Sequence, residues 1–249
     1  MRDYSHIVQR IEALSHPYMA NRVLGGVAGY PVFGLSLSTD GSLPVIFVNG
    51  GTHGDEPAGV EAALAFLEQD QSAWLTHLQF EVIPCLCPYG YVNDTRFNAQ
   101  DLDINWAFLR DDVPEIGMIQ SLIDGRRFAA VVDLHEDWES PGYYVYEQYR
   151  NRPALGFEIT RQVSEVCPLN LHAEIEGEIS KDGVVHPNLD VERRRKGEGI
   201  PIALFQQRYT DHLITSETPT ERPLPARVQA HLMALETMIA AHSNPLADP

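Results

Sequence analysis

The sequence predicts an α/β fold with three layers, in which helices cover both faces of a central mixed, mostly parallel β-sheet. Continuous apolar runs such as Pro44 to Asn49 are typical of strands that are buried on both faces. Segments with helical spacing of apolar residues separate these runs, and this alternation favours right-handed β-helix-β crossovers. With 249 residues, 44% of them hydrophobic, the chain can bury a large core.

The first half of the chain supplies the pattern of alternating helices and strands. An amphipathic helix is expected near the start because Ile7, Ile11 and Leu14 share one stripe. A later stretch alternates apolar and small residues, as an antiparallel strand does. The elements expected here are a helix over Tyr4 to Leu14, strands over Tyr30 to Ser36 and Pro44 to Asn49, a helix over about Glu56 to Leu67, and a strand over Leu78 to Cys85.

The second half repeats the arrangement. Ile116, Ile119 and Ile123 have near-helical spacing, and an apolar strand that ends at His135 follows them. The elements expected here are helices over Pro114 to Phe128, Pro153 to Val166 and Pro225 to Ala241, and strands over Ala129 to Leu134, Tyr143 to Tyr146, Ile202 to Phe205 and Leu213 to Ser216.

The organisation expected is one domain over residues 1–249. Residues 1–25 form an N-terminal helix and lead-in, and residues 174–199 form a charged insertion of long loops because charge and glycine dominate there. The run from Arg193 to Lys196 in this insertion has the ordinary explanation of a solvated charge run.

Composition excludes several classes of function. A formal charge of −17 and a pI near 4.8 oppose binding to nucleic acid or to anionic membranes, since such binders need a basic face. Cys85, Cys87 and Cys167 lack metal-ligand or disulfide-framework spacing, which favours reduced thiols. No signal-peptide core or bilayer-spanning segment is evident, so the expected location is the cytoplasm. The sequence does not indicate an oligomeric state.

The segment VNGGTHGDEP, residues 48–57, carries the strongest chemical signal. His53 and Glu56 lie where a strand gives way to a helix, and the two preceding glycines allow a tight turn. Open α/β sheets place their sites at such strand ends. Zinc accepts nitrogen and oxygen ligands of this kind, although the pair also arises by chance and a glutamate suits a helix N-terminus. The pair therefore calls for a third ligand.

His135, in VVDLHED, is the best third ligand because it also follows an apolar strand. A three-ligand zinc site keeps one position open for water. Such a site needs a general base, and Glu217 follows another apolar strand and precedes a proline. The competing explanation for Glu217 is a solvated acid before a turn.

The polar stretch between the ligand segments offers supporting groups. Arg96 can stabilise an oxyanion, and Asp103 can accept a hydrogen bond from a zinc-bound imidazole. With these residues assembled, the chain resembles the zinc carboxypeptidase family in its broad sense, including the aspartoacylase and succinylglutamate desuccinylase branch and murein peptide amidases. The match runs from Asn49 to Pro219.

The resemblance implies roles for particular residues. It implies one zinc per chain on His53, Glu56 and His135, with Glu217 as base and Arg96 as oxyanion arginine. Asp103 and Asn105 fit the Asp-x-Asn-Arg motif, in which Asp supports a zinc histidine and Asn binds the substrate's carboxylate. The last position of this motif, where the family has arginine, differs in this chain.

Trp106 stands where the family has the arginine that clamps a terminal carboxylate. An indole cannot replace a bidentate guanidinium. Either another cation takes over, with Arg110 or the Arg193 to Lys196 run as candidates, or the substrate differs. The substrate-contacting tyrosine stays open among Tyr143, Tyr144, Tyr146 and Tyr209.

The resemblance implies a hydrolase of C–N amide bonds, and a metallocarboxypeptidase that acts on peptides is expected first. A deacylase of N-acyl amino acids or a murein peptide amidase is the alternative. A non-catalytic zinc module that binds peptide C-termini and a metal-free scaffold are the interpretations from other classes.

Overall fold

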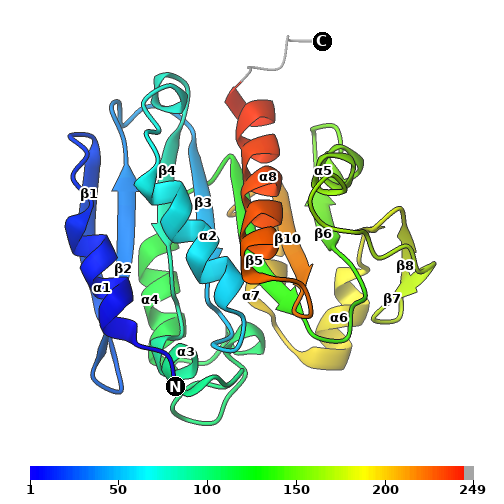
Figure 1. Cartoon of the computed structure of the whole chain (residues 1–249), viewed down its shortest axis with the longest axis horizontal. Helices are drawn as coiled ribbons and strands as arrows, with labels where there is room; N and C mark the ends of the chain where they lie inside the picture. The colour runs from blue at the N-terminus through cyan, green and yellow to red at the C-terminus, as the bar shows by residue number, and fades with distance from the viewer. Residues whose placement is uncertain (244–249) are drawn as a thin grey trace.

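A ten-stranded mixed sheet lies between two layers of helices in the computed structural model, which describes residues 1–243 (Figure 1). The strand order is β1-β2-β4-β3-β5-β10-β6-β9-β8-β7. The four neighbouring strands β4, β3, β5 and β10 are parallel, and antiparallel pairs dominate both flanks. The three-layer α/β/α fold with a central parallel region is therefore confirmed.

The strands are short where they build the flank near β7 and longer in the centre. They span Met19–Val27 (β1), Tyr30–Leu37 (β2), Val45–Gly50 (β3), Gln79–Ile83 (β4), Ala130–Asp137 (β5), Tyr144–Tyr149 (β6), Glu174–Ile175 (β7), Glu178–Lys181 (β8), Val184–Val185 (β9) and His212–Pro219 (β10). The helices span Tyr4–Ala13 (α1), Pro57–Glu68 (α2), Pro88–Asn93 (α3), Pro114–Ile123 (α4), Gly156–Val163 (α5), Leu189–Lys196 (α6), Ile200–Gln206 (α7) and Leu224–Ser243 (α8), with 3₁₀ turns at Trp74–Thr76 (η1) and Ile104–Trp106 (η2).

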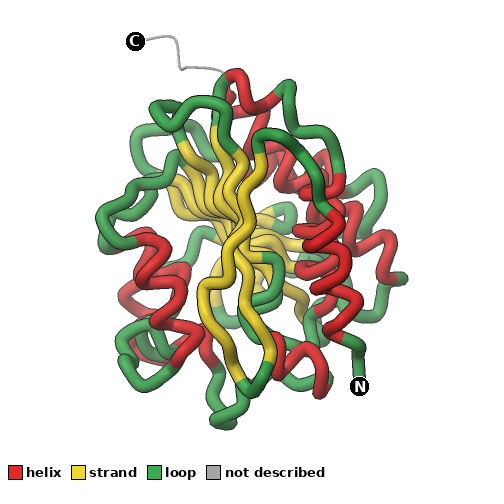
Figure 2. The backbone as a smooth tube through the Cα atoms, turned by 90° about the vertical axis from the view of Figure 1, so that its left-hand side faces the viewer, coloured by secondary structure: helices red, strands yellow, loops and turns green. Residues whose placement is uncertain are grey.

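Two hydrophobic clusters hold the layers together. On one face of the sheet, α1, α2, α5 and α8 pack their apolar sides against the strands, and α4, η2 and α7 do so on the other. The strands twist progressively across the sheet, as the view in Figure 2 shows. The carboxyl ends of β5 and β10 point to the lower edge of the sheet in Figure 1, and the candidate site lies there.

Three expectations from the sequence were wrong or incomplete. Residues 202–205 belong to helix α7 and not to a strand, since Gly199 is the N-cap residue and Pro201 lies in the first turn, where proline is favoured. A four-residue apolar run does not distinguish the two structures. The lead-in at residues 1–25 also contains the start of strand β1, whose exposed, Gly-containing sequence lacks a clear period.

The charged insertion at 174–199 is the third correction, because it is not a set of long loops. It contains the three short strands β7, β8 and β9 and the helix α6. The side chain of Asn188 caps α6 by accepting a hydrogen bond from the backbone N–H of Val191. Two-residue strands and a helix of low hydropathy have too few apolar residues to produce a periodic signal.

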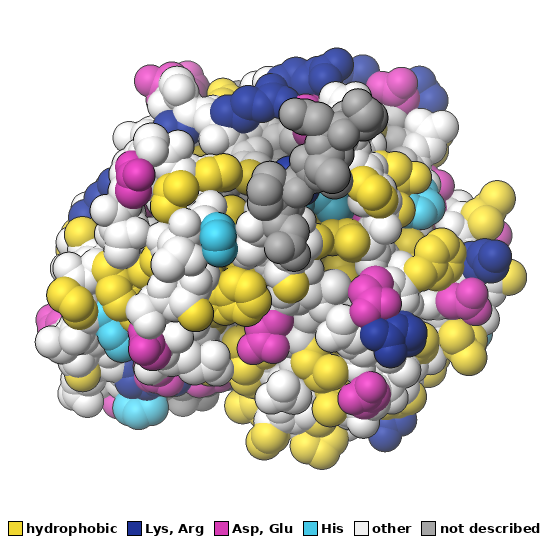
Figure 3. Space-filling model, turned by 90° about the horizontal axis from the view of Figure 1, so that it is seen from above, with side chains coloured by type: hydrophobic (Ala, Val, Ile, Leu, Met, Phe, Trp, Pro, Cys, Tyr) yellow, Lys and Arg dark blue, Asp and Glu magenta, His cyan; other side chains and the backbone are white. Residues whose placement is uncertain are grey.

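In the described part of the chain, no helix combines the length and the apolar character that a bilayer crossing needs. Figure 3 looks onto the end of the molecule opposite the site. Hydrophobic, acidic and basic side chains are interspersed over this face.

Candidate metal centre

The three predicted ligands come from two neighbouring strands of the parallel region. His53 lies in the loop between β3 and α2, and Glu56 is the residue before the first turn of α2. His135 lies within β5, which continues to Asp137 and so runs beyond the predicted end. The turn after β3 needs glycine, because Gly51 has a φ of +63°. The loop thereby returns His53 towards β5.

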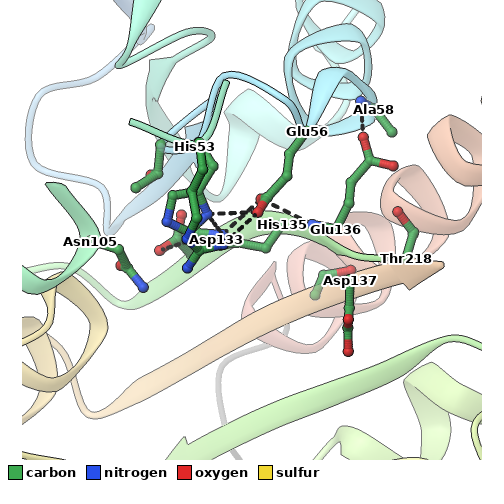
Figure 4. A network of polar contacts seen from close by, with 12 residues as sticks. His53, Glu56, Ala58, Asn105, Asp133, His135, Glu136, Asp137 and Thr218 are labelled. Atoms are coloured by element: carbon green, nitrogen blue, oxygen red, sulfur yellow. Dashed lines mark hydrogen bonds and ion pairs between the residues drawn. The ribbon is translucent and has the colours of Figure 1, made fainter. Parts of the chain in front are cut away.

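The ligand atoms converge on one point (Figure 4). His53 Nδ1 lies 2.6 Å from Glu56 Oε1 and 3.2 Å from His135 Nδ1, and His135 Nδ1 lies 3.0 Å from Glu56 Oε2. One ligand atom from each residue lies within 4.8 Å of the other two. All three side chains are buried. Two imidazole nitrogens and a carboxylate are a donor set that fits a divalent metal ion.

Each imidazole turns its other nitrogen towards a carboxylate. His53 Nε2 lies 3.0 Å from Asp103 Oδ1, and His135 Nε2 lies 3.2 Å from Asp133 Oδ2. The hydrogen bond to Asp103 favours the His53 tautomer whose Nδ1 is free for a metal, and the negative charge of Asp133 lies beside the corresponding nitrogen of His135. The predicted partner Asp103 is where it was expected. Asp133 was not assigned this role, although residues 133 and 135 share one face of a strand by the period of two.

The charges around the pair of histidines stabilise positive charge at the centre. Burial alone would lower the pKa of His135, but Asp133 and Glu56 raise it well above its ordinary value. Burial alone would raise the pKa of Asp103, yet the hydrogen bond and charge of His53 and the guanidinium of Arg96 lower it to about 2. Asp103 is thus held as a carboxylate. This is the electrostatic field that a cation requires.

Glu56 is the residue before helix α2, but its side chain does not cap the helix. A residue before a helix commonly caps it, but the Glu56 side chain makes no capping bond. Glu136 does so instead, since its Oε1 accepts a hydrogen bond of 2.6 Å from the N–H of Ala58. The N–H of Glu136 in turn donates to Glu56 Oε2 at 3.0 Å, and Arg227 forms an ion pair with Glu136. Neither role was apparent from sequence.

Glu217 lies beside the centre because β10 pairs with β5. Its register partners are His135 on one side and Tyr144 on the other. Burial is the largest cause that raises the pKa of Glu217 well above its ordinary value, and the negative charge of Glu56 adds to it. A carboxyl with a raised pKa can accept and return a proton near neutral pH.

Arg96 approaches the centre from the loop after α3. Its Nε donates to Asp103 Oδ2 at 2.8 Å, and its Nη1 lies 3.4 Å from Glu56 Oε1. The side chain is 39% exposed, so the guanidinium also faces the space above the ligands. The structure therefore brings Arg96 and Asp103 to the three ligands, as expected.

A cavity of about 290 Å³ opens over these residues. Asn105 and Trp106 form part of its wall, so the structure places both at the site. Oδ1 of Asn105 is buried without a hydrogen-bond partner in the described structure. Tyr144 and Tyr146 also line the cavity. Tyr143 lies on the other side of β10, and Tyr209 packs against the hydrophobic cluster that contains α4. Of the four candidates for the substrate-contacting tyrosine, Tyr144 and Tyr146 are therefore the two at the cavity.

The corrected segment 174–199 forms the far wall of the cavity. Lys196 Nζ lies 5.1 Å from the centroid of the Trp106 ring and 2.9 Å from Glu176 Oε2. Glu192 lies 3.5 Å from the same ammonium. Arg110, the other candidate cation, is exposed and pairs with Asp112. Of the two candidates, the run that contains Lys196 is the one whose described residues supply a cation to the cavity.

Comparison with solved structures shows which proteins share this fold. No protein-family profile and no curated protein matches the sequence. A Shewanella baltica OS155 structure, provisionally assigned as a metallopeptidase, has a TM-score of 0.82 with 22% identity, over 96% of this chain and 92% of that one.

Two structures with lower identity share the same architecture. A metallo-carboxypeptidase from Burkholderia cenocepacia has a TM-score of 0.70 and 15% identity over 96% of this chain and 69% of that one. Carboxypeptidase A from Helicoverpa armigera has a TM-score of 0.65 and 16% identity, covering 98% and 72%. At these identities the likeness concerns the fold. The chain has the fold of the metallo-carboxypeptidases, with a buried His53, Glu56 and His135 centre at the edge of its sheet.

Proposed function

We propose that this protein is a zinc-dependent hydrolase of C–N amide bonds, and that peptides with a free C-terminus are its leading substrates. The observation that carries the proposal is the convergence of His53 Nδ1, His135 Nδ1 and the Glu56 carboxylate beside Glu217. Two histidines and one glutamate are a ligand set of catalytic zinc, which leaves a position for water. The fold shared with metallo-carboxypeptidases supports the same assignment.

The residues around the ligands have complementary tasks. Zinc held by His53, Glu56 and His135 would polarise the substrate's carbonyl group and acidify a water molecule. Glu217 would accept a proton from the attacking water and deliver it to the leaving amine, so that it would end the cycle as a carboxylate. Arg96 donates to the oxygen on which negative charge develops, and Asp103 holds both Arg96 and His53 in place.

Lys196 is the group that we propose meets the substrate's carboxylate. Its ammonium lies over the Trp106 ring, at the position where the family arginine is replaced. Glu176 and Glu192 share this charge, so a carboxylate must compete with them. Recognition by one ammonium is less directional than by a guanidinium fork. We therefore expect a moderate, and not an absolute, preference for a free carboxylate.

The same feature favours one alternative function. A weak carboxylate site over an indole fits an amidase whose substrate has no free carboxylate at this place. A deacylase of N-acyl amino acids or a murein peptide amidase is the alternative function, and the assays below include substrates with and without that carboxylate. A zinc module without catalysis is disfavoured because Glu217, a group that can act as a base, lines the cavity opposite His135.

One set of assays separates these functions. Purified protein with one equivalent of zinc is incubated with N-acylated dipeptides, with their C-terminal amides, and with N-acetyl aspartate and N-succinyl glutamate. Release of a C-terminal residue from the free acids, lost by orders of magnitude in Glu217→Gln with zinc retained, is the expected result. Equal rates on the amides would favour the amidase. Full activity of Glu217→Gln, or no zinc uptake by wild type, would reject the proposed function.

A further inference from the structure

The hidden face of strand β10 carries a polar cluster that the proposed chemistry does not use. Side chains alternate along a strand, so Thr215 and Glu217 face the cavity while Ser216 and Thr218 face helix α8. Ser216 and Thr218 are both fully buried. Two hydroxyls in an apolar layer need partners, since burial without hydrogen bonds is costly.

A single histidine satisfies both hydroxyls. His231, on α8, is 0% exposed. Its Nδ1 lies 2.9 Å from Ser216 Oγ and its Nε2 lies 3.2 Å from Thr218 Oγ1. The Ser216 hydroxyl also lies 2.9 Å from that of Tyr143. The imidazole thus bridges the two residues that flank Glu217.

The bridge suits a neutral imidazole. Burial lowers the pKa of His231 to about 3, so one ring nitrogen donates and the other accepts. A hydroxyl can fill either role, and no charge is placed in the core. The cluster is complete as a set of hydrogen bonds and needs no water or ion.

The contacts of His231 lie where strand β10 is no longer paired with β6. Pairing of β10 with β6 ends at Glu217, opposite Tyr144, while pairing with β5 continues to Pro219. Beyond Glu217 the backbone is therefore held on one edge only. A strand end of this kind frays unless side chains hold it. The contacts of Ser216 and Thr218 with one ring restrain the backbone on both sides of Glu217.

We propose that His231 is a positioning residue that fixes the carboxylate of Glu217 relative to the metal centre. The inference rests on the proposed role of Glu217 as base. Displacement of a reacting group by about 1 Å can cost about 100-fold in rate. Loss of the bridge should therefore lower kcat by about 10- to 100-fold with little change in KM or in zinc content.

The test uses full-length protein with zinc and the N-acylated dipeptide that wild type cleaves fastest. The variants are His231→Ala, His231→Gln, and the matched control His242→Ala. Gln keeps a polar group near Thr218 and should recover part of kcat. His242 is also a buried histidine of α8, but its partner is His212, 3.0 Å away. Its variant should lose thermal stability without a change in kcat of the folded fraction.

A second readout does not depend on turnover. A crystal structure of His231→Ala should show the Glu217 carboxylate displaced or in several conformations, with His53, Glu56 and His135 unmoved. Normal kcat in His231→Ala, or a drop equal to that of His242→Ala, overturns the inference. If the inference on His231 fails but Glu217→Gln is inactive with zinc retained, the proposed function still holds. If Glu217→Gln is active, both are rejected.

Discussion

Replacing Asp133 with asparagine should weaken metal binding, because one oxygen of the buried carboxylate accepts a hydrogen bond from Asn49 and the other places negative charge beside the imidazole of His135. Asp133 Oδ1 accepts from Asn49 Nδ2 at 2.8 Å, and its Oδ2 lies 3.2 Å from His135 Nε2. An amide of the same shape has one oxygen only. Whichever way the introduced amide turns, its NH₂ group meets either the Asn49 amide or the imidazole N–H. Both arrangements disturb the orientation of His135.

The magnitude follows from the kind of contact that is lost. Removing a partner of a metal-bound histidine typically costs about 10- to 100-fold in metal affinity, or about 1.4–2.7 kcal/mol. Competition titration of zinc against a fluorescent chelator measures this change. Glu147→Gln is the matched control, since Glu147 Oε1 lies 3.0 Å from His212 Nε2 in a buried pair remote from the ligands.

The control separates folding from binding. Glu147→Gln should lower thermal stability and leave the zinc affinity of the folded protein unchanged. Asp133→Asn should lower zinc affinity at every pH at which the variant is folded. An unchanged zinc affinity in Asp133→Asn would show that Asp133 does not orient His135, and the proposed ligand orientation would have to be abandoned.

Two further predictions concern stability. Because the pKa of His231 is about 3 in the folded protein and about 6.5 when unfolded, the unfolded state binds more protons between these values, so stability rises with pH there. Lowering the pH from about 6.5 to about 5 should therefore cost metal-free protein about 1.6 kcal/mol through this residue. Urea unfolding of His231→Gln should show a smaller pH dependence, and an equal dependence would contradict the buried neutral imidazole. Gly54→Ala should prevent stable folding, because a Cβ would lie 1.8 Å from the backbone carbon of Gly90. Gly117→Ala, in helix α4 with open space around it, should be neutral or stabilising by up to about 1 kcal/mol, and a matching melting temperature for the two variants would refute the packing argument.

Sequence reasoning succeeded where a pattern is strongly periodic. Strands β3 and β5 and one face of helix α2 are buried in the core, so their buried positions are apolar and the pattern is visible in the sequence. The positions of His53 after β3 and of His135 in β5 followed from those elements. Glu217 lies within β10, which continues to Pro219, beyond the predicted strand end at Ser216. The convergence of the ligands could therefore be expected before the structure was known.

The remaining features depend on contacts that local sequence does not encode. Glu136 caps helix α2 from strand β5, and His231 contacts β10 from helix α8. The segment 174–199 has short elements that are held by neighbours and by the Asn188 cap, without an apolar period. The helix at 200–206 was mistaken for a strand because four apolar residues fit both periods.

The division of labour between the two walls of the cavity bears on how substrate choice can change. The metal ligands and Glu217 sit on the central strands and the loop after β3, where packing tolerates little substitution. Lys196 and Glu176 belong to a peripheral segment that joins the sheet only through short edge strands. Under the proposed function, exchange of residues 174–199 between related chains is therefore expected to change substrate specificity while the three proposed ligands and Glu217 stay in place, which makes this segment the one to exchange when new substrates are sought.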